Sequence, residues 1–322
     1  MSRNENPGLL PFDDIRALLK DMPGFDEKAA RVFVSDMHPR DVAGQSGQFA
    51  YWLAGWQGHM AARIRRPVVV LFAASHVTSI AASDELQVSD IMDLLGSIQN
   101  KTANVASMCA RSDLGLKVFE LAPEVPVADF THEAAMEESD CAATIAYGME
   151  ATAEGCDLLI VRGLAAGGAA SISALAAAVL GMASHSGDGQ DTTTSMALNL
   201  HKSHLTSPLE ILRRMGGREA AAVFGAITAA RLQRVPVILD GALALVIAVL
   251  MERLHKGACD HCLVSALDDH PDCDRLLQAL ARPTILSGCY SHDDGTTGAL
   301  ATQVLVSALS ISWSVREAES QP

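Results

Sequence analysis

The chain has 322 residues, of which 49% are hydrophobic and 4% aromatic, and its formal net charge at pH 7 is −14. This acidic excess argues against a protein that binds nucleic acid, because contacts with the phosphate backbone call for a basic surface. The most apolar run, 235–251, is interrupted by proline, aspartate and glycine and falls short of the roughly 20 apolar residues of a membrane span. Residues 1–7 lack the pattern of a signal peptide, and we therefore expect a cytoplasmic protein without a membrane partner.

Short buried strands alternate with helices along the chain. Helices are predicted at 12–22, 25–37 and 48–57, before a first strand at 68–73. The later predicted strands are 116–121, 157–161, 235–239, 260–265 and 284–286, and most of the segments between them have helical patterns. This alternation predicts an α/β fold with a mainly parallel, Rossmann-like sheet flanked by helices. We expect an α/β ligand-binding core over 46–299 and a smaller helical domain from the chain ends, with helices over 1–45 and a C-terminal helix and tail over 300–322.

Polar or glycine-rich loops follow several of these strands and also precede the last helix. In open α/β sheets, ligands bind beyond the carboxyl ends of the strands, where such loops converge. We therefore predict a small-molecule pocket there. Its predicted lining residues are Ser75, His76, Gly163, Gly167, Gly168, Ser171, Asp240, Gly241, Thr296, Thr297 and Gly298.

The segment 162–181 reads as a glycine-rich turn that opens into an Ala-rich helix. Backbone N–H groups at such a helix start suit a phosphate, which we would place on Gly167 to Ser171. A plain strand-to-helix turn, in which glycine only allows close packing, explains the same residues. Both interpretations stay open at this point.

Pro208 to Gly241 reads PLEILRRMGGREAAAVFGAITAARLQRVPVILDG, which is a helix, a glycine turn, a second helix and a buried strand. This stretch resembles the core of the nicotinate-nucleotide–dimethylbenzimidazole phosphoribosyltransferase family. The segments WLAGWQG at 52–58 and DFTHEAAM at 129–136 resemble further motifs of that family, so the resemblance covers roughly 46–312. It implies transfer of ribose 5-phosphate from nicotinate mononucleotide to a benzimidazole-type base, which forms α-ribazole phosphate for the cobalamin lower ligand.

The resemblance implies no cofactor, and it implies a homodimer, for which the apolar helix at 48–57 would be a contact face. The family's general base is a glutamate in a GEGTGAALA motif, and the matching segment here is DGTTGA at 294–299. Gly295 stands at the glutamate when the two are aligned at Gly298-Ala299 without a gap, and Asp294 does so with one inserted residue. Gly163 stands at a second glutamate of the family.

Asp294 is therefore the candidate catalytic residue. An aspartate is one methylene shorter than glutamate, so the base would lie about 1 Å short, which can cost on the order of 10²-fold in rate. The other interpretation is a solvated loop residue that caps the last helix. Two functions follow: an active transferase, or a catalytically impaired homologue that binds a ligand or pairs with an active partner subunit.

The seven cysteines are odd in number and scattered, as is typical of reduced thiols. Cys259-Asp-His-Cys262 offers one metal-binding pair, whereas a structural zinc site needs four ligands. We interpret these cysteines as buried thiols and predict no metal. A dinucleotide-binding oxidoreductase is disfavoured, because no GxGxxG motif follows a predicted strand.

Overall fold

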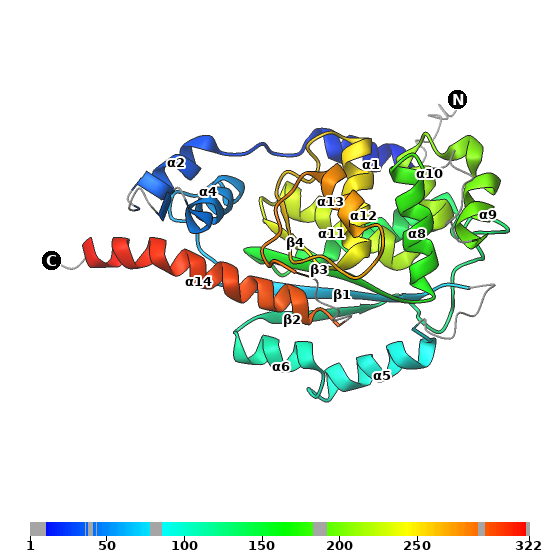
Figure 1. Cartoon of the computed structure of the whole chain (residues 1–322), viewed down its shortest axis with the longest axis horizontal. Helices are drawn as coiled ribbons and strands as arrows, with labels where there is room; N and C mark the ends of the chain where they lie inside the picture. Colours follow the sequence, from blue (N-terminus) through cyan, green and yellow to red (C-terminus); the bar gives the residue numbers. More distant parts are fainter. Residues whose placement is uncertain are drawn as a thin grey trace, which may run out of the picture.

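The computed structural model describes residues 11–35, 37, 41–42, 44–77, 86–182, 192–288 and 294–319, with side chains as far as residue 310. Within these residues, five parallel strands form one sheet in the order β2-β1-β3-β4-β5 (Figure 1). The strands are β1 (Pro67–Ser75), β2 (Gly115–Glu120), β3 (Leu158–Ala166), β4 (Val237–Leu239) and β5 (Cys262–Val264). The prediction of a parallel α/β sheet flanked by helices is confirmed.

Helices cover both faces of the sheet, because its central strands are apolar on both sides. β1 reads PVVVLFAAS and is buried along its whole length, as expected of a central parallel strand. The helices packed on one face are α1 (Pro11–Lys20), α7 (Glu138–Gly148), α8 (Gly168–Val179), α10 (Pro208–Met215), α11 (Arg218–Leu232), α12 (Gly241–Leu254) and α13 (Cys273–Leu280). Those on the opposite face are α2 (Glu27–Ser35), α4 (Gln45–Gln57), α5 (Val88–Gln99), α6 (Asn104–Arg111) and α14 (Thr296–Glu319).

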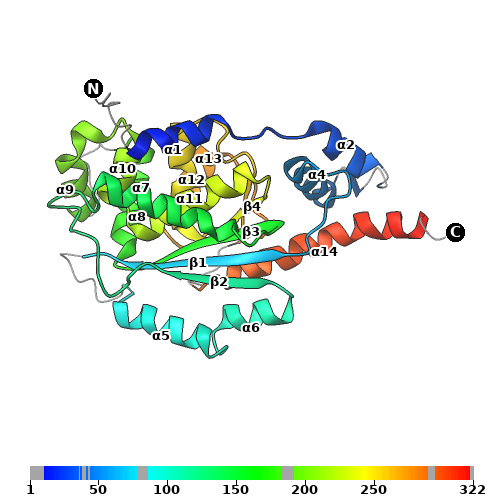
Figure 2. The same ribbon diagram turned by 180° about the vertical axis from the view of Figure 1, so that it is seen from behind.

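Helices from both ends of the chain meet at one end of the molecule. α2 packs on α4, and α4 packs on the C-terminal helix α14 (Figure 2). The first helix, α1, packs instead on α7 of the α/β body. The division of the chain at residues 45 and 299 stays a prediction. No helix of the described part of the chain has the length and apolar character that a membrane crossing requires.

Three elements differ from the sequence-based expectation. β3 continues to Ala166, because Arg162 to Ala166 pair in register with Leu71 to Ser75 of β1. The helical segment between the first two strands is broken into α5 and α6, with Lys101 between them at a φ of 59°. The last predicted strand, 284–286, is reduced to a single bridge between Thr284 and Val264. The remaining helices are α9 (Thr192–Leu200), which packs on α8, and the short 3₁₀ helices η1 (Met149–Thr152) and η2 (Lys202–His204).

Candidate active site

A cavity of about 300 Å³ lies at the carboxyl ends of β3 and β4. Most of its wall is apolar or made of small residues: Leu86, Gly163, Leu164, Ala165, Gly168, Ala169, Ile172, Gly241, Ala242 and Leu243. Its polar groups are Arg162, Glu219, Asp268, Asp269 and His270. A mainly apolar cavity with a few convergent polar groups is the usual form of a small-molecule site. The strand order also reverses between β1 and β3, and ligand sites of open α/β sheets lie beside such a point.

Gly163 allows α11 and α12 to close over the end of β3. A Cβ at this position would clash with Cδ2 of Leu243 and would lie 3.3 Å from Cγ of Glu219. The sequence predicted Gly163 as a site residue because of the strand that it follows. In the structure Gly163 lies within that strand and lines the cavity, and its missing side chain leaves space for Leu243 and Glu219.

A buried carboxylate–imidazole pair borders the cavity. Glu219, in the first turn of α11, is 1% exposed, and its Oε1 lies 2.9 Å from Nε2 of His76. Neither Oε2 of Glu219 nor Nδ1 of His76 has a hydrogen-bond partner within the described residues. Gly217 makes this approach possible, because a Cβ there would clash with Oε2 of Glu219 and lie 2.6 Å from Nε2 of His76.

Arg162 contributes a positive charge held between two carboxylates. Its Nη1 lies 3.5 Å from Oδ2 of Asp240, and its Nη2 lies 3.6 Å from Oδ2 of Asp268. Ser265 donates a hydrogen bond to Oδ1 of Asp240 over 2.7 Å, and the backbone N–H of Ala242 donates to Oδ2 of Asp268 over 3.2 Å. Burial raises the pKa of Asp268 even though Arg162 favours its charged form. The predicted site residue Asp240 thus fixes the arginine that lines the cavity.

The glycine-rich turn presents the start of α8 to the cavity. Gly167 has a φ of 67°, and its N–H donates to the carbonyl of Leu86 over 3.1 Å. Gly168 and Ala169 then line the cavity as the first residues of α8. Ser171 is buried, and its hydroxyl donates to the carbonyl of Met215 over 2.6 Å. The helix start therefore faces the cavity, whereas the Ser171 hydroxyl holds α8 against α10.

The start of α14 lies outside the cavity lining. Oδ1 of Asp294 accepts a hydrogen bond from the N–H of Thr296 over 3.0 Å, and its Oδ2 accepts one from Val105 over 3.2 Å. Gly295 has a φ of 90°, and a Cβ there would lie 2.8 Å from Cδ2 of Leu71 in the middle of β1. Both carboxylate oxygens of Asp294 thus engage backbone N–H groups in α14 and α6. Its assignment as the catalytic base stays a prediction.

Several other predicted residues are buried near the sheet without lining the cavity. The hydroxyls of Ser75, Thr296 and Thr297 are buried and have no hydrogen-bond partner among the residues described. A Cβ at Gly298 would lie 2.5 Å from Cγ2 of Ile160 and 3.0 Å from Cγ of Asp240. Their roles in binding stay predictions.

Known proteins match this chain over nearly its full length. A family model described as phosphoribosyltransferase matches residues 23–320. The nicotinate-nucleotide–dimethylbenzimidazole phosphoribosyltransferases of Rhizobium leguminosarum bv. trifolii and Sinorhizobium medicae are each 36% identical to the chain, over 93% of it and 93% of their own length. The chain belongs to the nicotinate-nucleotide–dimethylbenzimidazole phosphoribosyltransferase family. The fold agrees, since the crystal structure of the family's Thermus thermophilus protein superposes with a TM-score of 0.75 at 23% identity, covering 94% of this chain and 95% of that one.

Within this family fold, sequence reasoning missed the charged groups of the cavity. The missed lining residues with ionisable side chains are Arg162, Glu219, Asp268, Asp269 and His270. One signal was present for Glu219, because it is an acidic residue in the first turn of an Ala-rich helix that directly follows Gly216-Gly217. Arg162 carried a similar signal, because it follows the apolar run of a predicted buried strand.

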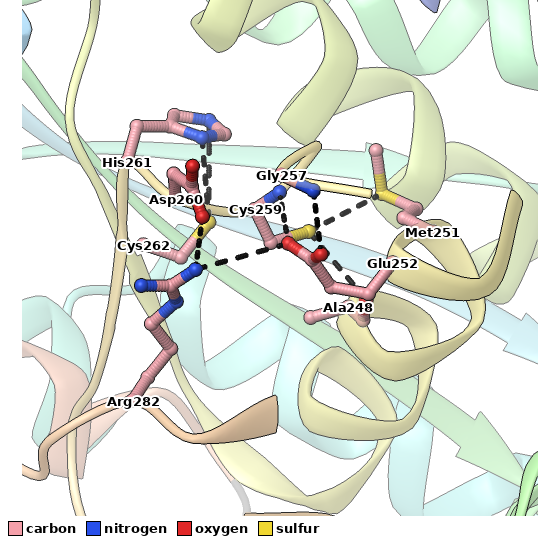
Figure 3. Close-up of polar contacts among 9 residues, drawn as sticks. All are labelled: Ala248, Met251, Glu252, Gly257, Cys259, Asp260, His261, Cys262 and Arg282. Carbon is pink, nitrogen blue, oxygen red and sulfur yellow. Dashed lines mark hydrogen bonds and ion pairs between the residues drawn. The ribbon is translucent and has the colours of Figure 1, made fainter. Parts of the chain in front are cut away.

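The cysteine pair lies at the other edge of the sheet, at the amino end of β5. Figure 3 shows Cys259 and Cys262 surrounded by polar partners. The N–H of Cys262 donates to the carbonyl of Cys259 over 3.0 Å, and Glu252 accepts hydrogen bonds from the N–H groups of Gly257 and Cys259. In the part of the chain that the structure describes, every cysteine is free and buried, and no group of three or more His, Cys, Asp and Glu residues could hold a metal ion.

Proposed function

We propose that this protein transfers ribose 5-phosphate from nicotinate mononucleotide to a benzimidazole-type base, which releases nicotinate and forms an α-linked ribotide. The observation that carries the proposal is the 36% identity to nicotinate-nucleotide–dimethylbenzimidazole phosphoribosyltransferases over 93% of both chains. The cavity at the carboxyl edge of the sheet supports it, because the reaction needs a place where two small molecules meet out of bulk water.

The cavity has the chemical features that the reaction requires. One ring nitrogen of the acceptor attacks the anomeric carbon, and the other ring nitrogen loses its proton, so an apolar slot and a carboxylate are needed. Leu86, Ile172 and Leu243 supply apolar wall, and Glu219 supplies a carboxylate. A nucleotide larger than this cavity would extend toward its mouth.

The phosphate and the nicotinate carboxylate need positive partners in a chain of net charge −14. Arg162 is one such partner, and the start of α8 at Gly168 and Ala169 is another, because unsatisfied backbone N–H groups at a helix N-terminus attract anions. We place the phosphate at this helix start.

A cytoplasmic homodimer belongs to the same proposal. The α4 helix is a weaker contact face than its sequence suggested, because Phe49, Leu53 and Trp56 are buried within the same chain. Phe49 and Leu53 share a hydrophobic core with residues of α2 and α14, and Trp56 packs against Phe25 and Arg231. The dimer itself awaits measurement by sedimentation at micromolar protein concentration.

The test of function is release of nicotinate from nicotinate mononucleotide in the presence of 5,6-dimethylbenzimidazole, followed by chromatography. We expect turnover that depends on both substrates. Ala169→Trp should abolish it by filling the cavity mouth, because Ala169 is exposed and lines the cavity. Ala279→Trp on α13 is the matched control, since Ala279 is also an exposed helical alanine but lies outside the cavity lining.

Two results would decide against this function. Nicotinate release without ribotide formation would indicate a hydrolase. Tight binding of either substrate without turnover would support the alternative of a catalytically impaired subunit. Equal loss of activity in both tryptophan variants would instead show that the activity does not depend on this cavity.

A further inference from the structure

Glu219 is an ionisable residue in a buried, Ala-rich helix. The whole of α11 from Glu219 to Arg231 is buried, and Glu219 itself is 1% exposed. A carboxylate in such a place is costly unless it is paired and hydrogen-bonded. Packing alone would be served better by an apolar side chain, so the carboxylate calls for a chemical explanation.

Only half of this carboxylate is satisfied within the described residues. Its Oε1 takes the hydrogen bond of His76 Nε2 at 2.9 Å, whereas Oε2 has no partner there. Glu219 lines the cavity, with its Cγ beside Gly163 and its buried Oε2 beside Gly217. An unpartnered acceptor next to an apolar cavity is suited to bind an N–H group of a ligand.

The other carboxylates near the sheet edge are already engaged, and Asp269, which also lines the cavity, interacts with the side chain of Asp268. Asp240 and Asp268 face Arg162, with further hydrogen bonds from Ser265 and from the N–H of Ala242. Both oxygens of Asp294 accept hydrogen bonds from backbone N–H groups. Glu219, in contrast, lines the cavity and has one carboxylate oxygen without a hydrogen-bond partner in the described residues.

We propose that Oε2 of Glu219 is the general base of the transfer reaction and that His76 is its positioning residue; this inference rests on the function proposed above. The lone pair of one acceptor nitrogen forms the bond to the anomeric carbon. The bond from that carbon to the nicotinate nitrogen breaks, and its electron pair leaves with nicotinate. The proton of the other acceptor nitrogen moves to Oε2 of Glu219 and then to water.

His76 fixes the orientation of Glu219 from the end of β1. Its ring is buried and packs edge-on against Phe130, with the ring centroids 6.5 Å apart. A donated hydrogen bond from Nε2 holds Oε1, which leaves Oε2 as the basic atom. Replacement of His76 should therefore act through Glu219 rather than on the substrate.

The first experiment compares kcat and nucleotide binding in Glu219→Gln, Glu219→Ala and the wild type. Loss of a general base should lower kcat by roughly 10²- to 10⁴-fold while the Kd for nicotinate mononucleotide changes little. Formate should restore part of the activity of Glu219→Ala by entering the space of the lost carboxylate. Glu138→Ala is the matched control, because Glu138 also lies in the first turn of a helix but outside the cavity lining.

A second measurement uses Glu219→Gln and therefore remains informative even if Glu219→Ala fails to fold. The loss in Glu219→Gln should shrink as acceptors with more acidic N–H groups are used, because they depend less on the base; a merely structural role would give the same loss for all. His76→Ala should lose activity, and His76→Gln should restore part of it by donating to Oε1. Formate rescue of Asp294→Ala in place of Glu219→Ala would overturn the assignment, as would an unchanged kcat in Glu219→Gln.

Failure of the proposed function is recognised separately, as absence of nicotinate release by the wild type. In that case the site is decided by binding of 5,6-dimethylbenzimidazole. Loss of a charged hydrogen-bond acceptor should raise its Kd by roughly 10- to 100-fold in Glu219→Ala. An unchanged Kd would overturn the placement of the acceptor at Glu219.

Discussion

At the scale of single residues, the pair Cys259 and Cys262 at the amino end of β5 illustrates how local partners set a charge state. Burial alone disfavours a thiolate at Cys262, but the hydrogen bond with Cys259 and the neighbouring His261 and Arg282 outweigh it and lower the pKa of Cys262 to about 6. Burial and the hydrogen bond with Cys262 raise the pKa of Cys259. These shifts place one thiolate on Cys262 at neutral pH.

This charge state predicts a thiolate titration below neutral pH. Native protein should lose absorbance near 240 nm as the pH falls through about 6, and Cys262→Ser should not. An unfolded cysteine titrates near 8.5, so between these values the folded chain binds fewer protons at this site than the unfolded chain. The site's contribution to the free energy of unfolding thus grows as the pH rises through this window and is lost as the pH falls through 6.

The control for this titration is Cys141→Ser, because burial raises the pKa of Cys141 and keeps its thiol protonated over the same range. That variant should keep the full change in absorbance. A wild-type protein whose absorbance is flat between pH 5 and 8 would contradict the thiolate at Cys262.

At the scale of elements, α7 and α11 cross where glycine allows their backbones to touch. A Cβ at Gly225 of α11 would clash with the carbonyl of Ile145, and a Cβ at Gly148 of α7 would clash with the carbonyl of Ala222. These atoms belong to the backbone and move only with their helix. The Ala-rich sequence of α11 therefore serves a close helix crossing rather than helix propensity alone.

The same substitution in two helices should consequently have opposite effects. Gly225→Ala should lower the free energy of unfolding by about 1–3 kcal/mol, the usual cost of overpacking. Gly96→Ala in α5 should raise it by about 0.5–1 kcal/mol, because a Cβ there meets no atom within 4 Å and alanine favours the helix. Urea unfolding of both variants measures this, and equal shifts would show that the crossing tolerates a methyl group.

The elements that the sequence predicted best are those with an uninterrupted run of apolar residues. β1, α11 and α12 have apolar patterns bounded by proline or glycine, and their positions follow from the chain alone. The end of β3 was missed because Gly163, Ala165 and Ala166 look like a turn. What extends this strand is its register with β1, which is a tertiary contact that no local pattern contains.

The same limit applies to the candidate site. The loops after β1, β3 and β4 could be placed from the sequence, because the carboxyl edge of a parallel sheet gathers them. Glu219 could not, because it enters the cavity from a helix start and becomes a neighbour of His76 only through the packing of α11 on the sheet. The family motif directed attention to Asp294, whose oxygens serve backbone N–H groups in the folded chain.

At the scale of the whole molecule, the net charge of −14 opposes an anionic substrate but leaves a neutral one unaffected. The field of the protein extends over about 30 Å at 0.01 M ionic strength and about 8 Å at 0.15 M. Of the two proposed substrates, nicotinate mononucleotide must cross this field, whereas 5,6-dimethylbenzimidazole is uncharged near neutral pH. Salt should therefore act on the two substrates differently.

We expect kcat/KM for nicotinate mononucleotide to rise several-fold between 0.01 M and 0.15 M salt, with little change for the neutral base. The rise reflects screening of long-range repulsion, while the proposed contacts at Arg162 and the start of α8 act at short range and are screened less. Initial rates at saturating co-substrate, measured in sodium chloride and again in potassium chloride, separate ionic strength from ion-specific binding. A fall in kcat/KM with salt would mean that local attraction at Arg162 and α8 outweighs the charge of the whole chain.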